Sequence, residues 1–130
     1  MKVLIADNDW RFAQQAGEYL ESKAHLVVHQ PKPKEALATI EHWQCELVIL
    51  SAELAEKGML EAINKLPNRP AIVLAGRLDQ YDCVWRAWQK GGDDILMKPI
   101  FHTHDLQVAM VTALENAAGG RRARKTRRSA

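Results

Sequence analysis

Cysteine is scarce in this sequence, with only Cys45 and Cys83 among 130 residues. Two cysteines so far apart do not form a disulfide framework, and each has apolar neighbours, so we expect two small core residues of a cytoplasmic protein. No apolar run approaches the roughly 18 residues that a membrane helix needs, and we identify no signal peptide. The sequence therefore predicts neither a membrane protein nor a disulfide-rich secreted one, and no membrane partner.

Short motifs that carry catalytic or metal chemistry are missing as well. The sequence contains no P-loop, no dinucleotide-binding glycine motif and no Gly-x-Ser-x-Gly elbow. Six residues could suggest zinc, but their spacing fits neither a finger nor a ribbon, and we interpret the histidines as surface residues. The six are His25, His29, His42, Cys45, His102 and His104. These absences favour a protein that is not an enzyme.

The length and composition are those of one globular domain. A chain of 130 residues, with 47% hydrophobic and 26% charged residues, can bury a core of its own. The formal net charge of +2 combines two oppositely charged parts, because six of the 18 basic residues lie in the last ten positions. The remaining chain has 12 basic and 16 acidic residues, a formal charge of −4. The six are Arg121, Arg122, Arg124, Lys125, Arg127 and Arg128.

The basic segment at the end of the chain, residues 119–130, has too little apolar surface to fold, and we expect a disordered tail. Its charge could neutralise the phosphates of a nucleic acid or another anionic surface. Without an aromatic residue it offers no readout of bases. A solvated run of charge is the simpler interpretation, and the sequence leaves both open.

Five short apolar runs alternate with longer segments of helical periodicity. The runs at residues 2–6, 25–29, 47–50, 71–75 and 95–97 are mostly rich in Val, Ile and Leu. Continuous apolar runs of this length are typical of strands that are covered on both faces, as in a parallel sheet. We therefore expect five buried strands.

The segments between these runs predict five helices. The first follows Asp9, a good N-cap, and carries apolar residues at helical spacing. The others are expected to begin near Pro33 and to cover residues 54–66, 80–90 and 106–117. Alternating strands and helices predict a doubly wound α/β domain with a parallel sheet in the order 2-1-3-4-5. In such a sheet, ligands bind at the carboxyl ends of the central strands.

The residues at the carboxyl ends of four expected strands therefore deserve comparison. Asp7-Asn8-Asp9 follow the first strand, Ser51 the third, Ala75-Gly76 the fourth and Lys98-Pro99 the fifth. Together with the strands before them they resemble motifs of CheY-like response-regulator receivers. The matching segments are VLIADND at 3–9, ELVILS at 46–51 and GGDDILMKP at 91–99. The resemblance covers residues 1–118 and implies a receiver-like domain with the flavodoxin-like (βα)₅ fold.

The resemblance assigns a role to two retained residues. Asp7 matches the first acid of the family's acidic pair, and Lys98 matches the lysine that contacts the phosphoryl oxygen. The resemblance also suggests a cis peptide bond between Lys98 and Pro99, a form that X-Pro bonds can adopt. Structural roles are open to both residues, since Asp7 can cap the first helix or its loop, and we expect Lys98 to pair with Asp7.

Four other positions depart from the family's pattern. Asn8 stands at the second acid, which ligates Mg²⁺, and Ser51 at the aspartate that accepts the phosphoryl group. Ala75 replaces a Ser or Thr that hydrogen-bonds the phosphoryl group, and Ile95 replaces an aromatic residue that moves on activation. The loss of two acids removes two negative charges where Mg²⁺ needs carboxylate oxygens. We therefore expect no Mg²⁺ or other cofactor and no aspartyl phosphate, and we expect the Ser51 hydroxyl to bond to nearby backbone.

The function predicted from these residues is that of an atypical receiver, a pseudo-receiver in two-component or phosphorelay signal transduction that acts by protein–protein contact. One alternative is a functional phosphorelay receiver with a non-standard acceptor, for which Ser51 and Glu53 are the candidates. Another is a nucleic-acid-associated regulator that uses the basic tail.

Four tryptophans are many for a chain of this size. On the expected fourth helix, Val84, Ala87 and Trp88 form a buried stripe, which leaves Trp85 at its edge with Tyr81. Exposed aromatic residues are enriched at interfaces, although Trp85 could equally cover the sheet edge. The resemblance implies that the face of the fourth helix, fifth strand and fifth helix binds partners. A sensor kinase, an output domain or a second copy in a homodimer are the expected partners, and the tail could be a linker to an output domain.

Overall fold

The structure is a computed structural model that describes residues 1–119. Its five strands are β1 Lys2–Ala6, β2 Leu26–His29, β3 Leu47–Ser51, β4 Ala71–Arg77 and β5 Asp94–Lys98. Its main helices are α1 Trp10–Ser22, α2 Pro33–Trp43, α5 Tyr81–Lys90 and α6 Thr103–Ala118. A short 3₁₀ turn, η2 Leu78–Gln80, leads into α5. Between β3 and β4 the chain forms α3 Ala52–Leu54, η1 Ala55–Met59 and α4 Leu60–Asn64.

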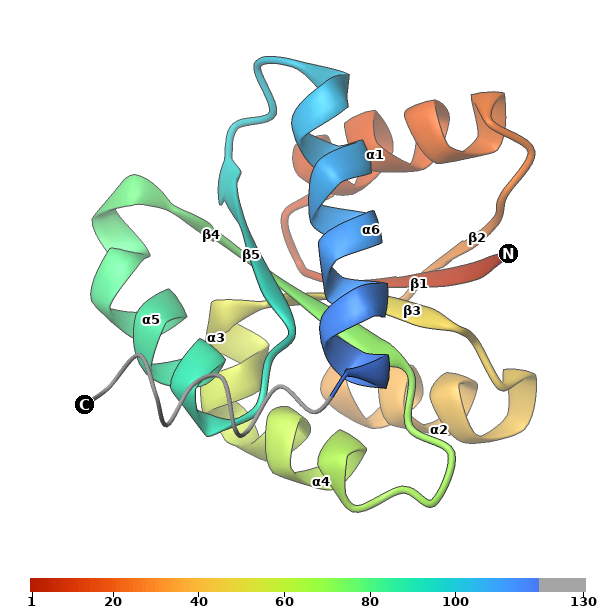
Figure 1. The fold of residues 1–130 in the computed structure, drawn as a ribbon, viewed down its shortest axis with the longest axis vertical. Coiled ribbons are helices and arrows are strands. Elements are labelled where there is room, and N and C mark those ends of the chain that lie inside the picture. Colours follow the sequence, from red (N-terminus) through yellow and green to blue (C-terminus); the bar gives the residue numbers. More distant parts are fainter. Residues whose placement is uncertain (120–130) are drawn as a thin grey trace.

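The five strands form one parallel sheet in the order β2-β1-β3-β4-β5, which confirms the predicted topology (Figure 1). β3 lies at its centre, and all five of its residues are buried. The register places Ala6 beside Leu50 and Ser51 beside Ala75. The carboxyl ends of β1, β3 and β4 therefore meet at one edge of the sheet.

Helices cover both faces of the sheet, which explains why the strands are continuous apolar runs. Alternate side chains of a strand point to opposite faces. Val3 and Ile5 of β1 pack in one core cluster with residues of α1 and α6. Leu4 and Ala6 pack in the other, with residues of α2, α4 and α5. Figure 1 shows α1 and α6 together on one side of the sheet.

Local signals place the ends of two helices where the sequence predicted. The Asp9 carboxylate accepts a hydrogen bond from the Phe12 N–H at 3.1 Å and so caps α1. At the end of α5, Gly91 adopts φ of 150°, a value that favours glycine, and its N–H donates to the Trp88 carbonyl.

The third helical segment differs from the prediction, because a continuous helix over residues 54–66 is wrong. Helical structure begins earlier, at Ala52, and is interrupted within η1. Lys57 and Gly58 leave the helical region, Lys57 through its ψ of 15° and Gly58 through its φ of 96°. Glycine adopts a positive φ without the steric cost that a side chain imposes. Two short helices joined at a bend therefore bury the apolar residues of this segment.

The two cysteines have different surroundings. Cys45 is buried among apolar side chains of the core, as predicted, and burial raises the pKa of its thiol to about 11. Cys83 is only half-buried, so its assignment as a core residue is wrong in part. Both thiols are free. Within residues 1–119, no helix is long and apolar enough to cross a membrane.

Candidate functional site

Asp7 immediately follows β1 and lies at the carboxyl edge of the sheet, where its side chain is only 1% exposed. Its Oδ1 accepts a hydrogen bond from the Asp9 N–H at 2.9 Å, which holds the loop before α1. The His29 Nε2 lies 2.6 Å from the Asp7 main-chain carbonyl, so this nitrogen carries the proton and donates it. The carboxylate is therefore fixed by its own loop, and the main chain of Asp7 is held by the neighbouring strand β2.

Lys98 reaches the same point from the end of β5. Its Nζ lies 2.7 Å from Asp7 Oδ2 and 3.4 Å from Asp9 Oδ2, and its side chain is only 6% exposed. The predicted pairing of Lys98 with Asp7 is confirmed. The Asp7 Oδ2 atom makes no hydrogen bond of good geometry, so this contact is an ion pair governed by charge rather than direction. The Lys98–Pro99 peptide bond is cis, as the resemblance suggested.

Two contacts of the Lys98 ammonium were not foreseen from the sequence. The Asp9 carboxylate contacts it in addition to capping α1, and the Phe12 ring centroid lies 4.7 Å from the same Nζ. A cation over an aromatic face is attracted by the ring. The available signal was the spacing Asp7-x-Asp9 directly after the first strand, because the carboxyl ends of parallel strands lie at the same end of the sheet as Lys98. We call Asp7, Asp9, Phe12 and Lys98 the lysine cluster.

The electrostatics of Asp9 follow from this arrangement. Partial burial by itself raises the pKa of a carboxyl group. At Asp9 the hydrogen bond from the Phe12 N–H and the charge of Lys98 outweigh burial, so the pKa of Asp9 lies below its ordinary value of 3.8. Asp9 is therefore charged at neutral pH and contributes to holding the lysine.

Ser51 and Ala75 lie side by side at the ends of β3 and β4. Ser51 is buried, and its Oγ accepts a hydrogen bond from the Leu54 N–H at 3.1 Å. This confirms the predicted bond to nearby backbone, since the hydroxyl caps α3. Ala75 is fully buried and presents only a methyl group. Neither residue supplies a carboxylate.

The structure does not bring the remaining two predicted positions into the lysine cluster. Asn8 is exposed, one residue beyond the buried Asp7. Ile95 is half-buried within β5 and packs against the core cluster shared by α2, α4 and α5. Glu53, the candidate substitute acceptor, is exposed on α3.

The donor atoms at this edge do not fit a magnesium ion. Mg²⁺ prefers octahedral oxygen ligands, with one or two carboxylates that face the ion. Here the Asp7 and Asp9 carboxylates already contact the Lys98 ammonium, and the Ser51 hydroxyl oxygen accepts a backbone hydrogen bond. A divalent cation that bound these carboxylates would have to displace the Lys98 ammonium or lie close to it, where the two positive charges repel. Within residues 1–119, no three His, Cys, Asp or Glu side chains are grouped as metal ligands.

The histidines that could have suggested zinc lie apart in other contacts. His25 Nδ1 lies 3.0 Å from the Met1 ammonium, and His29 contacts the Asp7 carbonyl and, edge to face, the Trp10 ring at 4.6 Å. Both are half-buried, so their assignment as surface residues is wrong in part. His42, His102 and His104 are exposed, as predicted.

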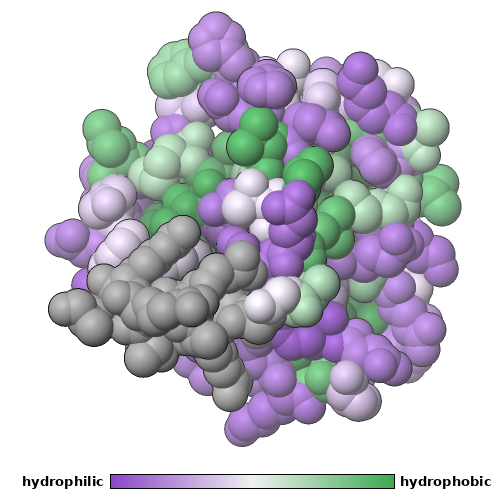
Figure 2. Space-filling view, viewed as in Figure 1, coloured by the Kyte–Doolittle hydropathy of each residue, from purple (hydrophilic) through white to green (hydrophobic). Residues whose placement is uncertain are grey.

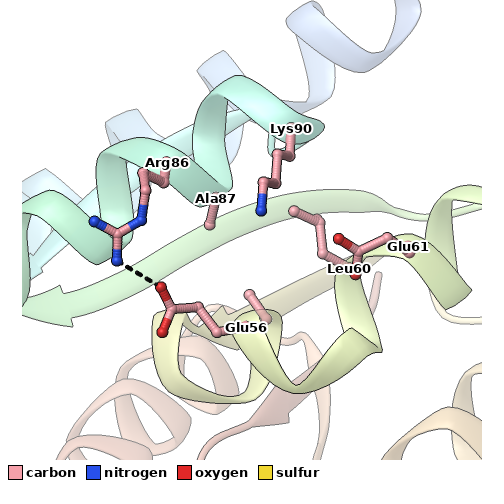
Figure 3. A pocket seen from close by; sticks show the side chains of 7 residues that line it. Glu56, Leu60, Glu61, Arg86, Ala87 and Lys90 are labelled. Atoms are coloured by element: carbon pink, nitrogen blue, oxygen red, sulfur yellow. Dashed lines mark hydrogen bonds and ion pairs between the residues drawn. The ribbon is translucent and has the colours of Figure 1, made fainter.

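A small pocket of about 230 Å³ lies away from the lysine cluster, between the bent segment after β3 and helix α5 (Figure 3). Arg86 and Lys90 point from α5 toward the segment that carries Glu56 and Glu61. Arg86 donates to Glu56 at 2.8 Å, and this bond holds the pKa of Glu56 below its ordinary value. The prediction of a continuous helix concealed this pocket, because residues on both sides of the bend, Glu56 before it and Leu60 and Glu61 after it, line one wall.

An apolar surface covers the outer side of α5, β5 and α6, and we call it the α5–β5–α6 face. Val84, Ala87 and Trp88 are buried as predicted, and Trp85 is 41% exposed. The rings of Tyr81 and Trp85 stack at 6.4 Å. A shallow groove of about 430 Å³ continues the surface along β5 and is lined mainly by apolar side chains, which include Leu78, Ile95, Met97, Phe101 and Val108. Figure 2 shows apolar side chains beside α6 and over β5.

The six basic residues of the C-terminal tail, Arg121, Arg122, Arg124, Lys125, Arg127 and Arg128, lie outside the described residues. The predicted disorder of the tail and its contact with nucleic acid therefore stay predictions.

Comparison with known proteins supports the fold. No protein-family model matches the chain, and no curated protein matches its sequence. Among solved structures, NtrX from Brucella abortus aligns with 97% of this chain at 22% identity and a TM-score of 0.81, and the chain spans 29% of that protein. The receiver domain of the same NtrX gives 22% identity and a TM-score of 0.78, with 87% of this chain and 98% of that chain covered. The chemotaxis response regulator CheY4 of Vibrio cholerae gives 18% and 0.72, with 87% and 98% covered. The chain therefore has the CheY-like α/β fold.

Proposed function

We propose that this chain is an atypical receiver-like domain of a two-component or phosphorelay system that signals by protein–protein contact, without phosphorylation of an aspartate of its own. The CheY-like fold and the motifs at the carboxyl edge of the sheet support a receiver-like role. A cytoplasmic location belongs to the same proposal.

The observation that carries the proposal is that both carboxylates of the lysine cluster contact its ammonium. A receiver needs a carboxylate that attacks phosphorus and a divalent cation that neutralises the negative charge gathered there. Here the Lys98 ammonium lies 2.7 Å and 3.4 Å from the two available carboxylates, and Ser51 and Ala75 stand where an acceptor and its hydroxyl partner would be needed. Both carboxylates contact the ammonium, although two acids against one lysine leave a net charge of −1, and neither Ser51 nor Ala75 is acidic. In this proposal the edge therefore has no acceptor carboxylate and no acid free of the lysine to hold a cation.

The α5–β5–α6 face is the contact surface in this proposal. Large aromatic side chains that are exposed together supply most of the binding energy in many interfaces. Tyr81, Trp85, Leu78 and Phe101 all remain exposed on this face within residues 1–119. We propose a sensor kinase or an output domain as its partner, with a second copy of the chain as the alternative occupant.

The first experiment compares the wild-type chain with the double variant Asn8→Asp/Ser51→Asp, which restores two acids at the carboxyl edge. Aspartate is a good N-cap, so the Ser51 change keeps an acceptor for the Leu54 N–H. We expect no change in the ¹H–¹⁵N spectrum of the wild type on addition of Mg²⁺ and beryllofluoride. We expect no gain in its mass after incubation with acetyl phosphate. The double variant should show saturable shifts with Mg²⁺.

A saturable, Mg²⁺-dependent response of the wild type would overturn the proposal. If that response disappeared in Ser51→Ala or Glu53→Ala, the chain would be a working phosphorelay receiver with a non-standard acceptor. The contact surface is tested separately, by capture of partners from cell extract on the wild type and on Trp85→Ala. Retention of the same partner by Trp85→Ala would exclude the α5–β5–α6 face as the binding surface.

A further inference from the structure

Strand β2 forms one edge of the sheet and, within residues 1–119, pairs with β1 only (Figure 1). The main-chain N–H groups of Leu26 and Gln30 donate to the carbonyls of Met1, just before that neighbour, and of Ile5 within it, both at 3.0 Å. The intervening residues Val27 and His29 therefore direct their main-chain groups toward the open edge. An open edge is a template for pairing with another strand, and proteins commonly protect it with charged residues or proline. The four residues Leu26–His29 contain neither lysine, glutamate nor proline.

A groove of about 670 Å³ runs beside this edge, between α1 and β2. Ala13, Gly17 and Val27 contribute its apolar lining. Trp10 stands at one end, where its ring contacts His29 and where it is 66% exposed. A large aromatic residue with this exposure, beside a groove that is apolar in part, is the pattern of an interface anchor next to a receiving surface.

The charges along the groove differ between its two ends. Helix α1 runs opposite to β2, since Trp10 lies beside His29 whereas Gly17 lies beside Val27. Arg11 is therefore at the His29 end, and Glu18 and Glu21 are toward the Leu26 end. All three are exposed, and none forms an ion pair with another residue of the described range 1–119. The groove is basic at one end and acidic at the other.

We propose that a second copy of this chain occupies this edge, with its β2 antiparallel to the first β2 about a twofold axis. Antiparallel strands exchange hydrogen bonds between directly opposite residues, so Val27 of each copy would face His29 of the other, with Val28 on the axis. The same symmetry brings the basic end of one groove to the acidic end of the other. Arg11 of each copy then lies opposite Glu18 of its partner, and Trp10 of each covers the groove of the other. A self-complementary patch of this kind is what a twofold dimer requires.

This dimer is independent of the proposed contact surface. β2 and β5 are at opposite edges of the sheet, so a dimer through β2 leaves the α5–β5–α6 face open for a protein partner. Loss of the β2 dimer in an experiment would therefore leave the proposed function intact.

The experiment measures self-association of the full chain by sedimentation equilibrium, from micromolar to near-millimolar concentration. We expect a dimer whose dissociation constant rises about thirtyfold in Trp10→Ala, the loss typical of an aromatic anchor that the interface buries. Trp85→Ala is the matched control, a partly exposed tryptophan on helix α5 and away from β2, and should leave the dissociation constant unchanged. A chain that stays monomeric throughout, or a dimer that is lost in Trp85→Ala and kept in Trp10→Ala, would overturn the proposal.

A charge exchange makes the test specific for the antiparallel register. Arg11→Glu and Glu18→Arg should each weaken the dimer, and the double variant Arg11→Glu/Glu18→Arg should restore it, because the opposed pair is recreated with its signs reversed. Both residues are exposed, so neither change disturbs the core. Hydrogen exchange supplies a second measurement: the amides of Val27 and His29 should become protected as the concentration rises. Equal exchange in monomer and dimer would exclude pairing through this edge.

Discussion

The lysine cluster and the α5–β5–α6 face lie close together along β5, but the first buries charged side chains that are paired and the second exposes aromatic ones. At the carboxyl edge of the sheet, the Lys98 ammonium is enclosed by two carboxylates and an aromatic ring and is only 6% exposed. On the outer face, Trp85, Tyr81 and Phe101 remain open to solvent. The region where a receiver would bind its ligand is closed by its own residues, and the neighbouring face offers unsatisfied apolar surface.

This difference indicates where binding free energy is available. An ammonium already paired with the carboxylates around it has little left to gain from an incoming ligand. An exposed aromatic cluster gains when a partner removes it from water, at roughly 25 cal/mol per Å² of apolar surface. The proposed role in protein–protein contact relies on this difference, and each of the following changes tests one side of the contrast.

The largest effect on the free energy of unfolding is expected when the charge of Lys98 is removed from the lysine cluster. Lys98→Met leaves the Asp7 carboxylate buried without its counter-charge, and removal of one partner of a buried ion pair costs about 3–5 kcal/mol. Urea denaturation monitored by tryptophan fluorescence measures this loss. The double variant Asp7→Asn/Lys98→Met is the control and should recover much of the stability, because neither charge remains. A loss below about 1 kcal/mol in the single variant would mean that Asp7 is hydrated in solution.

A smaller effect is expected on the outer face. Trp85→Ala should cost about 1–2 kcal/mol in the free energy of unfolding, because Trp85 loses only the part of its ring that packs on Trp88, at 5.1 Å between ring centroids. Trp88→Ala, at a buried position of the same helix, should cost about 3–5 kcal/mol. Equal losses in the two variants would show that Trp85 serves the fold rather than a contact surface.

The charge of Asp9 is expected to matter less and to depend on pH. Asn keeps the cap on α1, so Asp9→Asn removes only the attraction to Lys98, which should be worth below about 1 kcal/mol at neutral pH. Because the pKa of Asp9 is lowered in the fold, its stabilisation is present above the ordinary value of 3.8 and is lost as the pH falls through the lower folded value. Denaturation of both proteins from pH 7 to pH 3 should show the difference shrinking. A difference that grows on acidification would contradict the assignment.

The smallest effect is expected at the pocket beside α5. Glu56 and Arg86 are joined at 2.8 Å, nearly as closely as Asp7 and Lys98, but their side chains are 47% and 57% exposed. Arg86→Gln should leave the free energy of unfolding within experimental error, since water screens such pairs. It should still raise the pKa of Glu56 toward its ordinary value, because the hydrogen bond from Arg86 is the main cause of the lowered value. Titration of the Glu56 carboxyl carbon by NMR measures this shift.

Several features of the site were predictable because they depend on neighbours in sequence or on the resemblance. Asp9 as an N-cap and Ser51 as a hydroxyl bonded to nearby backbone are local features, and both are confirmed. The bend at Gly58 was not predictable from apolar spacing, because two short helices and one longer helix can bury the same residues. The pocket beside Arg86 was missed with it.

By itself, the sequence determined the number and order of the strands, four of the five predicted helices and the parallel arrangement of the sheet, but not the interrupted helical segment after β3. Apolar periodicity and caps act over a few residues, and right-handed crossovers leave few ways to connect five such units. Only the tertiary structure decided that Asp9, 89 residues before Lys98, shares its ammonium with Asp7, and that Phe12 lies beside it. Contacts of this kind depend on distances and side-chain directions that are set only when β1 and β5, which are not adjacent in the sheet, are held in one fold.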